Sequence, residues 1–252
     1  MKSQYLLECC VDSVESAVYA KEGGADRLEL CSNLIIGGTT PGLALFRRIR
    51  ETVDLPIRVL IRPRFGDFLY SPAEFEILKK EVELFRHEQA DGIVIGCLTP
   101  EGSLDLARMT ALMELAGPLP VTLHRAFDMT KDPFQALSQA KALGIDTILT
   151  SGQAACCLEG ISLLKELTAA AKGDVTILAG AGINAETVKQ LLERTAVAAF
   201  HMSGKKTLQS RMEYRNPTVS MGLPGISEYE IWQTDPDEIR RVHRLLSYSS
   251  GF

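Results

Sequence analysis

The stretch GADRLELC at residues 24–31 closes a helix-like segment and begins a short apolar run. The same kind of junction recurs as QADGIVIG at residues 89–96 and as GIDTILTS at residues 144–151. In each, an aspartate stands just before a run that is typical of a strand buried on both faces. One strand-and-helix unit is therefore reused at intervals of roughly 25–35 residues.

Short apolar runs of this kind alternate with amphipathic segments along most of the chain. Helix start signals lie between them: Asp12 with Glu15 and Ser71-Pro72 with Glu74 as capping boxes, and Asp132-Pro133 and Asp235-Pro236 with proline in the first turn. The runs predict eight strands: Leu6–Cys10, Arg27–Cys31, Ile57–Arg62, Gly92–Gly96, Val121–Arg125, Thr147–Ser151, Thr176–Gly180 and Ala198–His201.

Eight such units with right-handed crossovers predict an α/β fold of the (β/α)8 TIM-barrel type. A doubly wound open sheet is the alternative. We expect a single domain over residues 1–252, with the barrel core at about 5–204 and an extension and final helix at 205–252. The long irregular segment before that helix, at 205–234, is of a length that usually serves function or an interface.

Composition narrows the function classes. The chain has 252 residues, is 46% hydrophobic and carries a net charge of −5. Without a lysine or arginine run, nucleic acid is not an expected partner. With no apolar run long enough for a membrane span and no signal at the N-terminus, a cytoplasmic protein is expected. We predict no organic cofactor.

Charged side chains lie at the predicted strand ends. Glu8 shares a face with Cys10, and Glu29 with Cys31, because side chains alternate along a strand. Ionised groups inside a barrel need partners, so a purely structural salt-bridge network is one interpretation. The other is a site at the carboxyl ends of the strands, where barrel enzymes keep their active residues. The catalytic candidates are Glu8, Glu29, His124 and Asp128.

Arginines and glycine-rich turns at the same end predict an anion site. The turn GAGIN at residues 180–184 follows the seventh strand and opens a helix, a place where backbone amides often hold phosphate. Tight packing turns are the alternative. The ligand-binding candidates are Arg62, Arg64, Asp67, Arg125, Ser151, Gly180, Gly182, Asn184, His201 and Ser203.

Six cysteines occur in a chain expected to be cytosolic, where thiols stay reduced. Cys10 and Cys31 stand at equivalent places in consecutive units and would suit Cu(I), although inward side chains of adjacent barrel strands lie in staggered layers. Two buried small hydrophobes, or a nucleophilic pair, are the alternatives. No role is predicted for Cys97, Cys156 or Cys157.

Several motifs together resemble the copper homeostasis protein CutC family. The resemblance implies a (β/α)8 barrel, a cytoplasmic location, a homodimer or homotetramer and a role in copper handling, with Cys10 and Cys31 matching the pair proposed to hold Cu(I). The turn before Asn184 and the residues after Ser151 depart from the family pattern. The matching stretches are CVDSVESA (10–17), GGADRLELC (23–31), IRPR (61–64), GDF (66–68), HRAFD (124–128), LTSG (149–152) and FH (200–201).

Three hypotheses for the function follow. The first is a cytosolic Cu(I)-binding protein with thiolate ligands at the barrel mouth. The second is a barrel enzyme acting on a small phosphorylated or carboxylated metabolite, with Arg62, Arg64 and the 180–184 turn holding the anion while Glu8, Glu29 or His124 moves protons. The third is a scaffold whose segment 205–234 mediates assembly.

Overall fold

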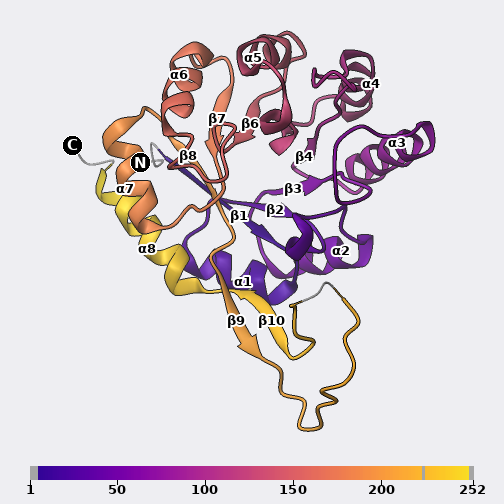
Figure 1. Cartoon of the computed structure of the whole chain (residues 1–252), viewed down its shortest axis with the longest axis vertical. Coiled ribbons are helices and arrows are strands. Elements are labelled where there is room, and N and C mark those ends of the chain that lie inside the picture. Colours follow the sequence, from indigo (N-terminus) through magenta and orange to yellow (C-terminus); the bar gives the residue numbers. More distant parts are fainter. Residues whose placement is uncertain (1–4, 223–224, 250–252) are drawn as a thin grey trace.

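A computed structural model describes residues 5–222 and 225–249. Eight parallel strands close into a barrel in chain order, surrounded by helices (Figure 1). The predicted (β/α)8 fold is therefore confirmed, and each predicted strand is present to within two residues at its ends. The strands are β1 (Leu6–Val11), β2 (Arg27–Leu30), β3 (Ile57–Leu60), β4 (Gly92–Ile95), β5 (Val121–Leu123), β6 (Thr147–Thr150), β7 (Thr176–Ala179) and β8 (Ala199–Met202).

The helices lie outside the barrel. They are α1 (Val14–Gly23), α2 (Leu43–Thr52), α3 (Pro72–His87), α4 (Leu106–Ala116), α5 (Pro133–Ala142), α6 (Ile161–Ala171), α7 (Ala185–Arg194) and α8 (Pro236–Ser249), with short 3-10 turns η1 (Leu34–Ile36) and η2 (Arg125–Met129). The capping box of Ser71 and Glu74 is confirmed, as is the Asp132 cap. The Asp12 cap is wrong: Ser13 caps α1 by accepting from Ser16 N. The Asp12 carboxylate is therefore not used to cap α1.

The repeated junction has one geometry in all three places. The first residue of each junction adopts a left-handed backbone conformation, with φ of 95° at Gly24, 60° at Gln89 and 78° at Gly144. The next residue donates back to the last helical turn at 3.0 Å in each case, which is a common helix ending. The aspartate that follows joins the neighbouring strand, as Asp26 does with Leu7. The repeat thus fixes where each helix turns back into the sheet.

The two faces of the barrel strands differ in chemistry. Leu7, Cys9 and Val11 pack outward into the main core beneath the helices. Glu8 and Cys10 alternate with them and face inward. The β1–β2 register pairs Cys10 with Glu29, and the β1–β8 register pairs Glu8 with His201. Polar groups of three strands therefore meet inside the barrel.

The segment between β8 and α8 is less irregular than predicted. It contains β9 (Lys205–Gln209) and β10 (Glu230–Thr234), which pair antiparallel as a separate two-stranded sheet. Figure 1 shows this sheet beside α1, extending away from the barrel. Thr234 N donates to Ser16 Oγ at 3.1 Å, which ties β10 to α1. Within the described residues, no helix has the length and apolar character needed to cross a membrane.

Candidate functional site

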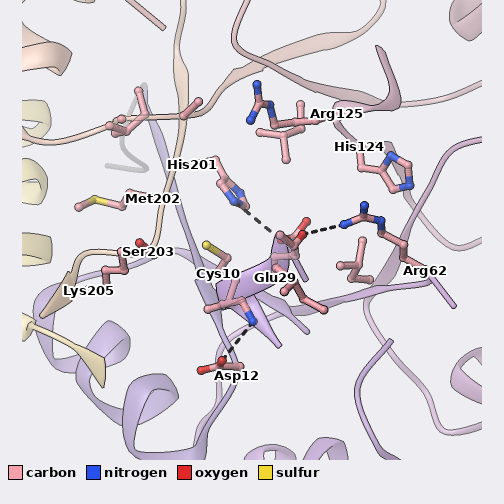
Figure 2. Close-up of a pocket in the computed structure, with 18 of the residues that line it drawn as sticks. Cys10, Asp12, Glu29, Arg62, His124, Arg125, His201, Met202, Ser203 and Lys205 are labelled. Atoms are coloured by element: carbon pink, nitrogen blue, oxygen red, sulfur yellow. Dashed lines mark hydrogen bonds and ion pairs between the residues drawn. The ribbon is translucent and has the colours of Figure 1, made fainter. Parts of the chain in front are cut away.

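A cavity of about 720 Å³ opens at the carboxyl ends of the barrel strands. Its walls include Cys10 from β1, Glu29 from β2, Arg62 after β3, His124 after β5 and His201 from β8. Figure 2 shows these side chains converging on a common space. Five strands thus contribute polar groups to one site, as in barrel enzymes.

Glu8 bonds the lining residue His201 but does not itself line the cavity, and it is only 1% exposed. Its carboxylate accepts from Arg27 Nε at 2.5 Å and bonds His201 Nδ1 at 2.7 Å. Burial alone would raise the pKa of Glu8, but the bond to His201 and the charge of Arg27 outweigh it and lower the pKa to about 2. Glu8 is therefore a permanent anion that fixes the imidazole ring of His201.

Cys10, Glu29 and His201 form a cluster whose potential ligand atoms all lie within 4.8 Å of one another. His201 Nε2 is 3.8 Å from a Glu29 oxygen. Burial would lower the pKa of His201, but the neighbouring Cys10, Glu29 and Glu8 raise it well above its ordinary value. Without a bound ion, the His201 ring is thus a cation that donates to Glu8 and presents its second N–H to Cys10 and Glu29.

Glu29 behaves differently from Glu8 although the two are close. Burial raises the pKa of Glu29 to about 7, and the Glu8 anion adds to this while His201 and Arg27 only partly oppose it. Two carboxyl groups in one site are thereby separated in acidity, which is how acid and base roles are usually divided. Glu29 can hold or release a proton near neutral pH.

In the view of Figure 2, Arg62 and His124 lie on the side of Glu29 that faces away from Cys10 and His201. Arg62 donates to the carbonyl oxygens of Gly37, Gly38 and Gly66 at 2.8–3.2 Å. His124 Nδ1 accepts from Ala126 N at 3.1 Å. Burial, with the charge of Arg62, lowers the pKa of His124 to about 3. His124 is therefore a neutral ring, unsuited to accept a proton as a base.

Arg125 and Asp128 line the rim but are bonded mainly to each other and to the β6 loop. Arg125 Nε pairs with Asp128 at 2.7 Å and its Nη2 donates to Ser151 Oγ at 2.9 Å. Asp128 also accepts from Thr150 Oγ1 and from the backbone of Ser151. Ser151 itself is fully buried beneath this network and does not line the cavity. These contacts hold the loop after β6 in place.

The other predicted anion-binding residues divide into two sets. Gly182 and Ser203 line the cavity, whereas Gly180 and Asn184 do not. Asn184 instead caps α7 through Glu186 N and Thr187 N. Arg64 and Asp67 pair with each other at 2.9 Å on the loop after β3, outside the cavity wall. Arg64 is further held by Glu74 at 2.6 Å.

The two candidate copper thiols lie in different surroundings. Cys10 faces the cavity, while Cys31 is fully buried against Leu60 and Val94. The Cys31 thiol donates to Val11 O at 3.5 Å, and burial raises its pKa well above the ordinary value. All six cysteines are free thiols, and Cys97 and Cys157 are buried.

Lining residues that were not predicted include Asp12, Phe68, Lys205 and Trp232. Asp12 follows Cys10 by two residues, so strand alternation could have placed it on the inward face. Burial raises the pKa of its carboxyl group. Lys205 Nζ lies 3.2 Å from the Trp232 ring centroid, and this pair comes from the unpredicted β9–β10 sheet.

Comparisons with known proteins agree with this fold. The model of the CutC family matches residues 5–206. A human protein named copper homeostasis protein cutC homolog is 44% identical over 242 residues, covering 96% of this chain and 89% of the relative. A Bacteroides fragilis family protein CutC is 48% identical over 230 residues, covering 90% and 91%.

A solved structure extends the comparison. The crystal structure of a putative copper homeostasis protein CutC from Streptococcus agalactiae matches with a TM-score of 0.74 and 28% identity, covering 79% of this chain and 98% of that one. A thiamine phosphate pyrophosphorylase from Pyrococcus furiosus, 16% identical with a TM-score of 0.56 over 99% of this chain and 98% of its own, shares the fold alone. By the family match and these identities, the chain belongs to the CutC copper homeostasis family.

Proposed function

We propose that this protein binds Cu(I) in the barrel cavity, with the Cys10 thiolate and His201 Nε2 as ligands and Glu29 beside them. The observation that carries the proposal is the clustering of these three ligand atoms within 4.8 Å at the cavity base. Thiolate and imidazole are donors that suit copper, and Cu(I) tolerates low coordination. Membership of a copper homeostasis family supports the same metal.

The Glu8–His201 bond supports His201 as a ligand. Metal-binding histidines usually donate their other ring N–H to a carboxylate, which orients the ring. Glu8 stands in that place at 2.7 Å from Nδ1. Binding must displace the proton on Nε2, so we expect the apparent Cu(I) affinity to rise with pH.

The role predicted for Cys31 is a second thiolate ligand, and it stays a prediction. Cys31 does not line the cavity, and its register position lies beyond Glu29, the residue that pairs with Cys10. A Cys10–Cys31 pair of ligands would require the Cys31 thiol to break its hydrogen bond to Val11 O. The two ligand sets therefore make different predictions for a Cys31 variant.

Competition titration with a Cu(I) chelator under anaerobic, reducing conditions tests the proposal. We expect Cys10→Ser and His201→Gln to lose stoichiometric binding and Cys31→Ser to keep it, with Cys97→Ser as a buried-thiol control. Loss in Cys31→Ser equal to that in Cys10→Ser would favour the thiolate pair. Parental binding by Cys10→Ser would refute a copper site in this cavity.

A second candidate is an enzyme acting on a small anionic metabolite. Two observations favour it: the cavity of about 720 Å³ is large enough for an organic molecule, and Glu29 can exchange a proton near pH 7. Thermal-shift screening of phosphorylated and carboxylated metabolites tests it, because a ligand that binds only the folded state raises the melting temperature. The absence of any hit in both classes would count against this candidate.

A further inference from the structure

We propose that Arg62, His124 and Phe68 form a binding site for the carboxylate group of a small organic acid. These residues line the same cavity as the Cys10–Glu29–His201 cluster. The inference rests on the second candidate function and names its substrate class. It requires none of the proposed copper ligands.

Arg62 is a buried cation that lacks an anion. It is 7% exposed, and its partners among the described residues are carbonyl oxygens of the loops around Gly37 and Gly66. No carboxylate in this described part of the chain forms an ion pair with it, and its Nε is buried without a hydrogen-bond partner. Burying a charge without a counter-ion is unfavourable, so the fold maintains this arrangement against a penalty. A bound anion would remove that penalty.

His124 supplies a second donor beside this cation. Because its Nδ1 accepts from Ala126 N, the proton of the neutral ring lies on Nε2. That nitrogen is buried, and no group in residues 5–222 or 225–249 bonds it. His124 is 4% exposed. A buried donor left unpaired is costly and uncommon, which points to a missing acceptor oxygen.

The count and charge of these donors favour a carboxylate over a phosphate. Arg62 Nε and His124 Nε2 are two unpaired donors with one positive charge, which matches two oxygens and one negative charge. A phosphate monoester would bring a further oxygen and further charge. The other arginine of this wall, Arg125, is already paired with Asp128.

Phe68 lies beside both donor side chains and completes the site. Its ring lies 5.0 Å from Arg62 Cζ and 4.7 Å, centroid to centroid, from the His124 ring. Phe68 belongs to the connection between β3 and α3, which is free of helix or strand. Because Phe68 lies beside both side chains, an acid that reaches them would place its apolar body against the Phe68 ring. The site therefore favours an acid with a flat or apolar body.

Binding titrations with acids of matched shape test this inference. The probes are acetate and benzoate, each with its neutral amide, together with inorganic phosphate and phenyl phosphate. Binding of each probe to the full chain is measured by calorimetry. The variants are Arg62→Gln and His124→Asn, the latter keeping an acceptor for Ala126 N while losing the Nε2 donor. Arg64→Gln is the matched control, since Arg64 lies two residues on but outside the cavity wall.

We expect a carboxylate to bind, its amide not to bind, and both variants to weaken binding about tenfold or more, as loss of a charge-assisted bond implies. Arg64→Gln should bind as the parent does. Equal binding of acid and amide, stronger binding of phenyl phosphate than benzoate, unchanged affinity in His124→Asn, or no saturable carboxylate binding would each overturn the inference. Carboxylate binding without turnover of any acid would support the inference and count against the enzymatic candidate. Cu(I) titration of His124→Asn tests the copper proposal separately, because His124 is not a proposed copper ligand.

Discussion

His124 should make the protein lose stability steeply as the pH falls below neutral. Its pKa is about 3 in the folded chain, against an ordinary value of 6.5. Between these values the unfolded chain binds a proton that the folded chain does not, so unfolding is favoured as the pH falls. One proton corresponds to about 1.4 kcal/mol of unfolding free energy per pH unit once the pH is well below 6.5, or roughly 2 kcal/mol in total between pH 6.5 and 4.5.

Urea denaturation of the parent and His124→Asn at half-unit pH steps measures this effect. The difference in unfolding free energy between the two proteins should change by roughly 2 kcal/mol across that window, with the parent losing more on acidification. Other groups, including Glu29, titrate in both proteins and cancel in the difference. His87→Asn, at an exposed histidine of α3, is the control and should run parallel to the parent. Parallel curves for His124→Asn would refute the neutral buried ring.

Three further predictions concern the same cavity. The parent should lose stability as the pH rises from 4.5 through 7, because a carboxyl group with a folded pKa of about 7 is stabilising only while protonated, and Glu29→Gln should not show this loss. Denaturation at pH 5 and pH 8 should give a fall in unfolding free energy that is larger in the parent than in the variant by about 3 kcal/mol at most. Glu8→Gln should weaken Cu(I) binding about 10–100-fold in chelator competition, since His201 loses the carboxylate that orients it, and an unchanged affinity would argue against His201 as a ligand. Gly96→Ala should destabilise the fold by roughly 1–3 kcal/mol in denaturant titration, because a Cβ there would lie 2.5 Å from His124 Cε1; parental stability would mean that the ring shifts freely.

The fold was predictable from the sequence because its signals are local. Each strand is a short buried run, and the junctions before residues 27, 92 and 147 share one backbone geometry set by neighbouring residues. The β9–β10 sheet was not predictable in this way. Its strands are largely exposed and pair Lys205 with Thr234 across a long intervening segment, so neither alternation nor a turn signal identifies them.

The site was only partly predictable, for a related reason. Alternation along one strand places Glu8 and Cys10 on the inward face, which the structure has. Alternation still holds two residues on from Cys10 and Leu60, where Asp12 and Arg62 line the cavity, but it fails farther from the strand, where Arg64 turns to Glu74. Which residues of neighbouring strands meet depends on register, a property that no single strand encodes.

The stagger between β1 and β2 has a consequence for engineering a dithiol centre. Residue 29 pairs with Cys10 in the register of the two strands, while residue 31 lies two positions farther toward the carboxyl end of the barrel. A designer who wanted two sulfurs side by side would therefore choose Glu29→Cys and leave the natural cysteine of β2's end untouched. Cys10 and Cys31 stand at equivalent places in successive repeats, yet they are offset by two residues in the register of the two strands.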